Sequence, residues 1–212
     1  MRLLLGATLA LVALTSSACG GASRGHAAAP GTSTAPRSTS SFRGHAVEPV
    51  YSAPLFALRD QAGAPVRLAQ QRGRVVLVTF LYTRCPDVCP LIASRLNAVL
   101  RLLSPARRAK TRVLAVSVDP EHDTRSAVDR FVAEHRLLPQ FLYLTGLRAR
   151  LQPVWQAYNV LAAPVNERRI EHSAYTALID QRGRVRVTFG RTASVTAIAH
   201  DVARLLRDQP AP

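Results

Sequence analysis

Two runs of apolar residues dominate the pattern of this chain and predict the buried strands of a sheet. Residues 75–81 (VVLVTFL) contain one polar residue, and so do residues 113–118 (VLAVSV). Near-continuous runs of this kind are typical of strands that are covered on both faces. A third, shorter run lies at residues 141–144 (FLYL). We therefore expect a central sheet with helices on its faces.

Apolar residues at helical spacing predict the helices that alternate with these strands. The spacing recurs in residues 89–103, 124–135, 148–158 and 194–207. Short strand candidates precede the first buried run, at residues 55–58 and 66–68. The order of the main elements is then strand-helix-strand-helix-strand-helix, followed by two strands and a last helix. This order predicts one mixed α/β domain without internal repeats.

The last two strands are expected to form a hairpin. Residues 175–179 and 185–189 flank the sequence DQRGR, whose glycine suits a tight turn. The preceding residues, 161–171, show no clear period and contain Pro164, so we interpret them as a loop or a small excursion.

The first residues predict an export signal and a tether. Arg2 precedes an apolar run at residues 3–14, which is shorter than the roughly 20 residues that span a bilayer. Small residues and Cys19 follow, and this resembles a bacterial lipoprotein signal, although Ser16 replaces its usual leucine. An ordinary secretory signal is the alternative. Either signal would export the protein to an oxidising compartment.

We therefore divide the chain into three parts. Residues 1–18 are expected to be a signal peptide of the lipoprotein type, and residues 19–50 a flexible tether rich in Gly, Ala, Ser, Thr and Pro. Residues 51–208 are expected to form the domain. A lipid on Cys19 would anchor the domain on the extracytoplasmic side of the cell membrane.

The charge of the chain is strongly positive. It has 28 Lys+Arg against 13 Asp+Glu, for a formal net charge of +15, and Lys110 is the one lysine. The arginines are scattered, aromatic residues are few and no binding motif accompanies the charge, so we do not expect nucleic acid as a partner. An anionic membrane surface and an acidic partner both remain open.

Two cysteines, Cys85 and Cys89, lie between the first buried run and its helix. Ligands and chemistry collect at the carboxyl ends of strands in open α/β sheets. The helix N-terminus and Arg84 would lower a thiol pKa there, whereas Asp87 would oppose them. The two sulfurs can converge on one metal ion or on each other as a disulfide. Two thiolates favour a soft metal and are too few for a closed structural zinc site, while two inert buried cysteines are the alternative.

One histidine of the domain stands out as a third ligand. His172 immediately precedes the strand at residues 175–179. If that strand runs antiparallel to residues 75–81, His172 lies at the same edge of the sheet as the cysteines. Asp119 ends the run at residues 113–118 and reaches this edge too if the strands are parallel. The remaining histidines are interpreted as packed in the core or solvated: His26, His45, His122, His135 and His200.

Three segments, TRCPDVCP, VSVDPEHDT and EHSAYTALID, resemble the SCO/SenC family, in the same order. The resemblance covers about residues 54–206. It implies a thioredoxin-like α/β fold with a mixed central sheet flanked by helices. Members of this family are membrane-tethered copper proteins that help to build the copper centre of cytochrome c oxidase. The resemblance assigns the copper ligands to Cys85, Cys89 and His172 and gives Asp119 a supporting role. Residues before the ligand histidine are commonly acidic in this family, and Glu171 fits that pattern.

The chemistry of these residues is compatible with that function. Two thiolates and one imidazole suit Cu(I), and would hold Cu(II) if a fourth donor were added. We therefore expect copper delivery to the copper-binding subunit of the oxidase, or reduction of the thiols of that subunit.

The rival function is that of a thiol–disulfide oxidoreductase or thiol peroxidase with Cys85 and Cys89 as a redox-active pair. Three features oppose it. Three residues separate the cysteines, against two in thioredoxins, and no proline directly precedes residues 175–179. A peroxidase would need Thr or Ser three residues before its cysteine, where this chain has Tyr82.

Overall fold

The computed structural model describes residues 42–166 and 169–208 of this chain. The expected signal peptide, most of the tether and Cys19 lie outside these residues. The strands are β1 (His45–Ser52), β2 (Ala57–Arg59), β3 (Pro65–Arg67), β4 (Val75–Leu81), β5 (Thr111–Ser117), β6 (Phe141–Leu144), β7 (Ala162–Asn166), β8 (Arg169–His172), β9 (Tyr175–Ile179) and β10 (Arg184–Gly190). The helices are η1 (Leu68–Gln71), α1 (Val88–Leu102), α2 (Pro105–Ala109), α3 (Arg125–Glu134), α4 (Arg148–Ala157) and α5 (Val195–Arg207).

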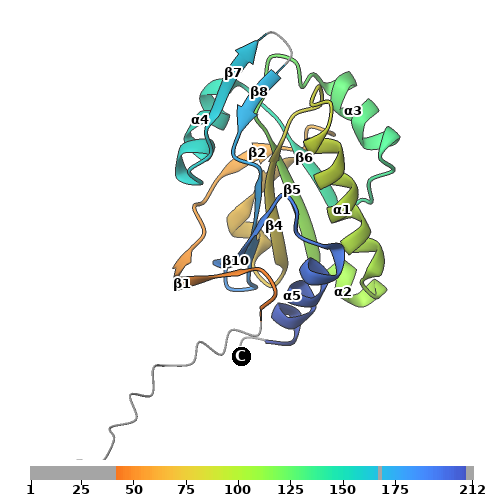
Figure 1. The fold of residues 1–212 in the computed structure, drawn as a ribbon, viewed down its shortest axis with the longest axis vertical. Coiled ribbons are helices and arrows are strands. Elements are labelled where there is room, and N and C mark those ends of the chain that lie inside the picture. The colour runs from red at the N-terminus through yellow and green to blue at the C-terminus, as the bar shows by residue number, and fades with distance from the viewer. Residues whose placement is uncertain (1–41, 167–168, 209–212) are drawn as a thin grey trace, which may run out of the picture. The chain divides into compact units, whose positions relative to one another are not determined.

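A six-stranded mixed sheet is the centre of the fold, with the strand order β1-β10-β9-β4-β5-β6 (Figure 1). β4 runs parallel to β5, which runs parallel to β6, and all seven residues of β4 are buried. β9 runs antiparallel to β4, with Thr176 opposite Thr79. The start of β9 and the end of β4 therefore share one edge of the sheet, which is the arrangement that the prediction for His172 requires.

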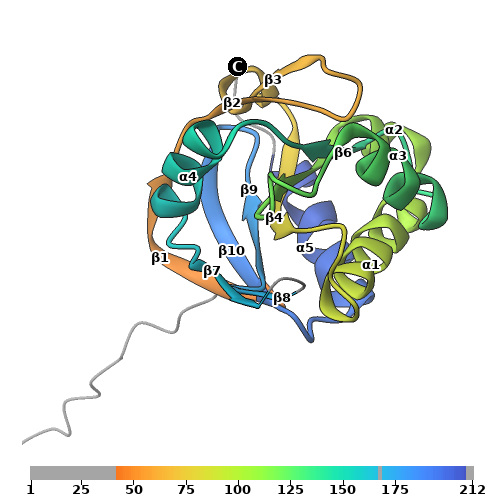
Figure 2. The same cartoon turned by 90° about the horizontal axis from the view of Figure 1, so that it is seen from above.

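Helices cover both faces of this sheet, which confirms the mixed α/β class. α1 and α5 pack against each other on one face, and α4 lies on the other (Figure 2). On the α4 face, the indole Nε1 of Trp155 donates to the Ser117 carbonyl oxygen at 2.8 Å. The ring of Tyr158 packs 5.6 Å from that of Phe80 in β4. These contacts fix the helix over the middle of the sheet.

The edge strand β1 departs from the expected boundary between tether and domain at residue 50. It pairs with β10 from His45 to Ser52, with a shift in register after Ala46. Its start is fixed by Asp201 of α5, whose buried carboxylate accepts hydrogen bonds from the backbone N–H groups of Arg43 and Gly44. Most side chains of β1 are exposed, so the strand lacks the apolar alternation by which a sequence reveals a strand.

The segment at residues 161–171, expected to be a loop or a small excursion, contains a two-stranded antiparallel hairpin, in which β7 pairs with β8. Pro164 lies in β7, opposite Ile170. A two-stranded ribbon with no further strands beside it has no alternating buried face to mark it in the sequence.

Candidate metal-binding dithiol site

The site is built on the turn that leads from β4 into α1. The chain leaves the sheet at Leu81, and the Cys85 N–H donates to the Tyr82 carbonyl oxygen. Asp87 caps α1, because its Oδ1 accepts the N–H of Val88 at 2.6 Å. This cap places Cys85 just before the helix and Cys89 in its first turn.

The two cysteines are reduced and face each other. The backbone N–H of Cys89 donates to the Cys85 sulfur at 3.3 Å. The Cys85 thiol lies 3.7 Å from the Asp87 Oδ1. Cys85 keeps 7% of its surface exposed, whereas Cys89 is fully buried. Solvent, a metal ion or a partner thiol therefore reaches Cys85 first.

The surroundings shift the two thiol pKa values in opposite directions. The pKa of Cys85 falls to about 6, first because the Cys89 thiol donates a hydrogen bond to it, and further because backbone N–H groups stabilise its thiolate. The pKa of Cys89 rises, because its proton is held in the bond to Cys85 and because burial opposes its charge. At neutral pH the pair therefore holds one thiolate and one thiol.

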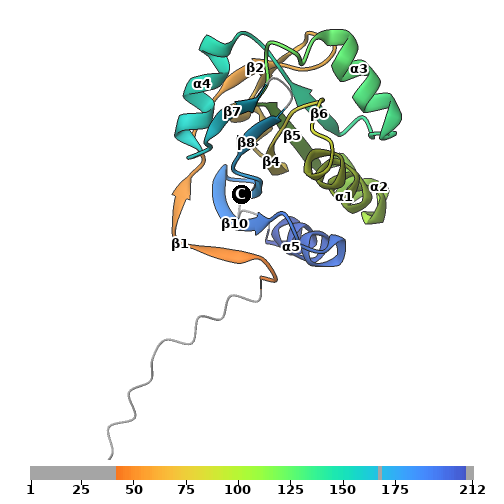
Figure 3. The same ribbon diagram turned by 45° about the horizontal axis from the view of Figure 1, so that its top comes forward.

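Tyr82 connects this pair to the β7–β8 hairpin. Its phenol hydrogen-bonds the Cys85 sulfur, and its oxygen accepts the backbone N–H of Ile170 at 3.3 Å. Burial raises the pKa of Tyr82 to about 12, so the phenol stays protonated. Figure 3 shows β8 beside the loop that enters α1. Sequence reasoning considered position 82 only for the hydroxyl of a peroxidase and missed this role.

Asp119 lies at the expected edge of the sheet and holds Arg84. Its buried carboxylate accepts from the Arg84 Nε and Nη2 at 3.2 and 2.9 Å, and lies 2.8 Å from the His122 Nδ1. Arg84 was expected to lower the pKa of a thiol. It is instead paired with Asp119, and hydrogen bonds to the sulfur lower the pKa of Cys85.

Asp123 is a further residue of the site, which the sequence did not reveal. Thr124 alone caps α3, through its bond with the Ala127 N–H. The buried carboxylate of Asp123 instead accepts from the N–H and hydroxyl of Thr83, at 2.8 and 2.7 Å. Ser117 and Tyr143 donate to its other oxygen, at 2.6 and 2.9 Å. Asp123 thereby fixes the loop that carries Cys85.

His172 is the last residue of β8, and its backbone pairs with that of Ala162 in β7. Because β9 begins at Tyr175, at the edge where β4 ends, the topology brings the backbone of His172 to the dithiol end of the sheet. The side chains of Glu171 and His172 lie outside the described residues. The assignment of His172 as a ligand therefore stays a prediction.

The other histidines of the fold have different surroundings. The ring of His135 packs 4.4 Å from that of Phe131, and His200 has its Nδ1 2.9 Å from the Asp201 Oδ1. His45 is exposed on β1. Among the described side chains, no group of three or more His, Cys, Asp or Glu is placed to hold a metal ion.

Comparisons with known proteins agree with this geometry. A family model described as SCO1/SenC matches residues 47–207. A SCO2-like protein of Rickettsia prowazekii is 31% identical over 137 residues, which cover 61% of this chain and 64% of the relative. This match therefore spans less than two thirds of the relative's length.

Two solved structures share the fold. The copper-bound ScoI of Bradyrhizobium japonicum is 30% identical, with a TM-score of 0.66, and the match covers 74% of this chain and 100% of that structure. The apo Sco1 of Thermus thermophilus is 30% identical, with a TM-score of 0.68, and the match covers 80% and 99%.

A mixed sheet flanked by helices, with two reduced cysteines between a central strand and its helix, defines a thioredoxin-like dithiol protein. The match of residues 47–207 to the family model identifies the class of protein more specifically than the fold does. The chain belongs to the SCO1/SenC family. No helix among the described residues is long and apolar enough to cross a membrane.

Proposed function

We propose that this protein binds copper outside the cytoplasm through Cys85, Cys89 and His172. The observation that carries the proposal is the link between the two ligand-bearing segments. The phenol of Tyr82 hydrogen-bonds the Cys85 sulfur and also accepts the N–H of Ile170, in the short strand that ends at His172.

The donor set suits copper as a transferable cargo. Thiolate sulfur and imidazole nitrogen are the ligands that Cu(I) prefers, and one more oxygen or nitrogen donor would accommodate Cu(II). Binding requires both sulfurs reduced and deprotonated, so copper loading depends on the redox state of the pair. The copper bound to the Bradyrhizobium relative supports this choice of metal.

The recipient that we propose is the copper-binding subunit of cytochrome c oxidase. The family resemblance supports this role, either as delivery of copper or as reduction of the thiols of that subunit. In this proposal residues 1–18 are removed, a lipid on Cys19 anchors the chain in the membrane and the tether gives the domain reach. Asp119 supports the site from its buried position and is not a ligand.

A titration of the reduced protein with Cu(I), in competition with a chelator, tests the ligand set. We expect one copper per chain. The variant His172→Ala should weaken copper binding by more than about 10-fold. Altering a residue that only supports a metal ligand typically lowers metal affinity by at least about 10-fold, and loss of a ligand itself should cost more. His45→Ala is the matched control, because this exposed histidine lies on the edge strand. Equal affinity of the two variants would contradict the assignment of His172.

The second candidate function is thiol–disulfide exchange. It is favoured by the lowered pKa of Cys85 and by the buried thiol of Cys89, which would attack a mixed disulfide formed on Cys85. The discriminating assay measures reduction of insulin disulfides and of peroxide by the protein and by Cys85→Ala. Activity that needs Cys85, together with copper binding that is unaffected in His172→Ala, would favour the redox enzyme.

A further inference from the structure

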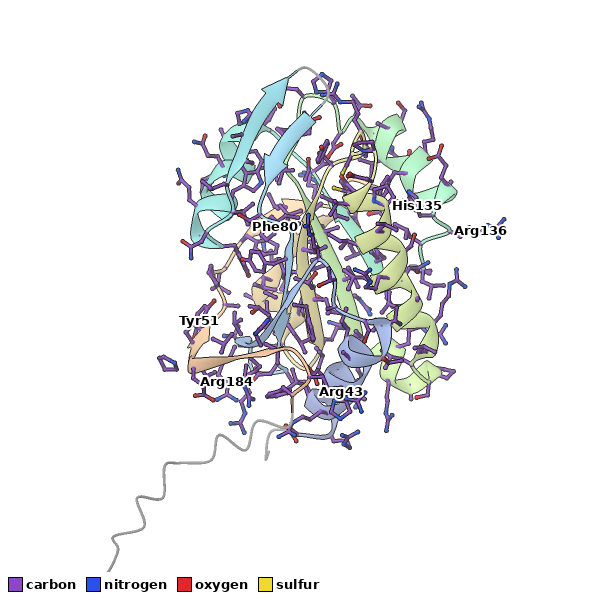
Figure 4. All side chains as sticks on the ribbon, viewed as in Figure 1. Arg43, Tyr51, Phe80, His135, Arg136 and Arg184 are labelled. Carbon is purple, nitrogen blue, oxygen red and sulfur yellow. The ribbon has the colours of Figure 1, made fainter. Side chains whose placement is uncertain are left out.

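The end of the domain opposite the dithiol is strongly basic. It is formed by the amino ends of β4 and β5, the turn between β9 and β10, and the carboxyl ends of α2 and α5. Five exposed cations define this basic end: Arg72, Arg107, Lys110, Arg182 and Arg207. In Figure 4 the labelled Arg184, in the same region, lies at the opposite end of the domain from the β7–β8 hairpin.

The cations of the basic end surround two hollows. Arg107, Lys110 and Arg207 line a hollow of about 400 Å³ together with Ala106 and Leu206. A second hollow of about 220 Å³ is lined by Arg182, Arg184 and Arg186, by the carboxylates of Asp180 and Asp208, and by Gln181 and Leu205. Leu205 and Leu206 are consecutive in α5, so the same end of this helix contributes a residue to the lining of each hollow.

The structure does not neutralise this charge. None of the five cations forms a salt bridge with a carboxylate among the described residues. Asp180 is occupied by Arg184 and Arg186. The other acidic residue at this end, Asp208, lies 4.0 Å from Arg204.

At the dithiol end, two arginines form salt bridges, Arg84 with Asp119 and Arg148 with Glu121. A cation in the last turn of a helix is favoured by the helix dipole, which accounts for Arg107 and Arg207. The same effect favours Lys110, the C-cap of α2, but not Arg182 in the turn between β9 and β10. The five exposed cations have no carboxylate partner among the described residues, so the basic end suits an external anion.

The first described residues of the chain also lie at this end. The ring of Phe42 lies beneath two guanidinium groups, 5.6 Å from that of Arg186 and 4.6 Å from that of Arg204. Arg186 also lines the second hollow. The segment that leads back to Cys19 therefore joins the fold beside the basic end.

We propose that the basic end binds the anionic phospholipid surface of the membrane. The proposal rests on the membrane attachment proposed above. Guanidinium groups bind phosphate oxygens in a bidentate manner, and each cation near an anionic surface adds to the binding. The exposed Leu102, at the carboxyl end of α1, adds an apolar contact.

Binding at the basic end would orient the dithiol away from the lipid. The seven residues of β4 separate the two ends of the sheet, which places the thiols on the order of 20 Å further from the membrane than the basic end. A tethered domain in this orientation presents Cys85 outward to a partner.

Co-sedimentation with vesicles tests the proposal. The chain from residue 20 onward, which carries no lipid and contains every described residue, is mixed with vesicles of phosphatidylcholine alone or with added phosphatidylglycerol. We expect binding only to the anionic vesicles, and weaker binding at high salt. The variant Arg107→Gln/Lys110→Gln/Arg207→Gln should lower the partition coefficient about fivefold per cation, or about 100-fold in total.

The matched control removes the same charge elsewhere, in the variant Arg125→Gln/Arg130→Gln/Arg150→Gln on α3 and α4. If the two variants lost the same amount of binding to anionic vesicles, the proposal would be overturned, because the loss would then reflect net charge alone. Absence of binding to anionic vesicles would also overturn it and would leave an acidic protein as the occupant. Copper titration of both variants should be unchanged, so a failed copper site and a failed lipid surface give different results.

Discussion

Cys85 and Cys89 have opposite protonation at neutral pH because different groups surround their sulfurs. Cys85 receives hydrogen bonds from the Cys89 thiol and from backbone N–H groups, whereas Cys89 is the donor and is fully buried. A metal ion that binds both sulfurs therefore meets one thiolate and displaces one proton. Copper binding near pH 7 should release that proton.

Alkylation by iodoacetamide should reveal this asymmetry. Only the thiolate reacts, so the rate at Cys85 should rise with pH and reach half of its maximum at about 6. Cys89 should react much more slowly, because it is buried and protonated. Mass spectrometry of quenched samples gives both rates across the pH series.

Variants of Cys89 provide the control for the pH profile. Cys89→Ser keeps a hydrogen-bond donor beside Cys85 and should keep the midpoint low. Cys89→Ala removes the donor and should move the midpoint up toward the value of an ordinary thiol, roughly 8.5. A wild-type midpoint already near that value would contradict the account of the thiolate.

The sequence predicted where the residues of the site lie more accurately than it predicted their hydrogen-bond and salt-bridge partners. It placed Asp119 at the dithiol edge, because the end of an apolar run marks the end of a strand. It could not foresee that Arg84 pairs with Asp119, or that Asp123 turns inward to Thr83. Both contacts join segments more than 30 residues apart, and no local pattern encodes them.

At the scale of elements, Asp123 joins the Cys85 loop to β5 and β6. Asp123→Ala would leave the N–H of Thr83 and three hydroxyl groups without their acceptor. We expect a loss of about 2–5 kcal/mol in the free energy of unfolding, measured by urea denaturation.

Asp129→Ala is the control for this loss. Asp129 lies on α3 in an exposed pair with Arg125, at 3.7 Å, and its removal should lower the free energy of unfolding by less than about 1 kcal/mol. If Asp123→Ala were no less stable than this control, Asp123 would not hold the loop as described.

The elements that the sequence predicted well are those that are buried in the core. The bounds of β4, β6 and β9 match the expected strands, because every residue of β4 is buried and its run is almost purely apolar. β1 was missed, and the pairing of β7 with β8 was not foreseen within the expected loop or small excursion. β1 is exposed along most of its length, and β7 and β8 pair only with each other, so neither leaves a periodic apolar pattern.

At the scale of the whole molecule, the proposed anchor is tested by Cys19→Ser. This change removes the site of acylation, so the protein should no longer carry a lipid when it is labelled with a radioactive fatty acid. The wild-type protein should carry the label and sediment with membranes. Absence of label on the wild type would contradict the lipoprotein signal and leave the ordinary secretory signal.

The fold also gives the molecule two ends with different chemistry. The thiols lie where β4 ends, and the uncompensated cations lie where β4 begins. In our proposals, this arrangement would combine a membrane-facing surface with an outward-facing metal site in one small domain, which would suit a copper donor on a tether.

The ligand set is the central claim, and copper K-edge X-ray absorption of the Cu(I)-loaded protein tests it most directly. We predict two sulfur ligands and one nitrogen ligand per copper. The nitrogen contribution should disappear in His172→Ala and persist in the control His45→Ala. A wild-type site with sulfur ligands alone, or a nitrogen contribution that survives in His172→Ala, would contradict the assignment of Cys85, Cys89 and His172.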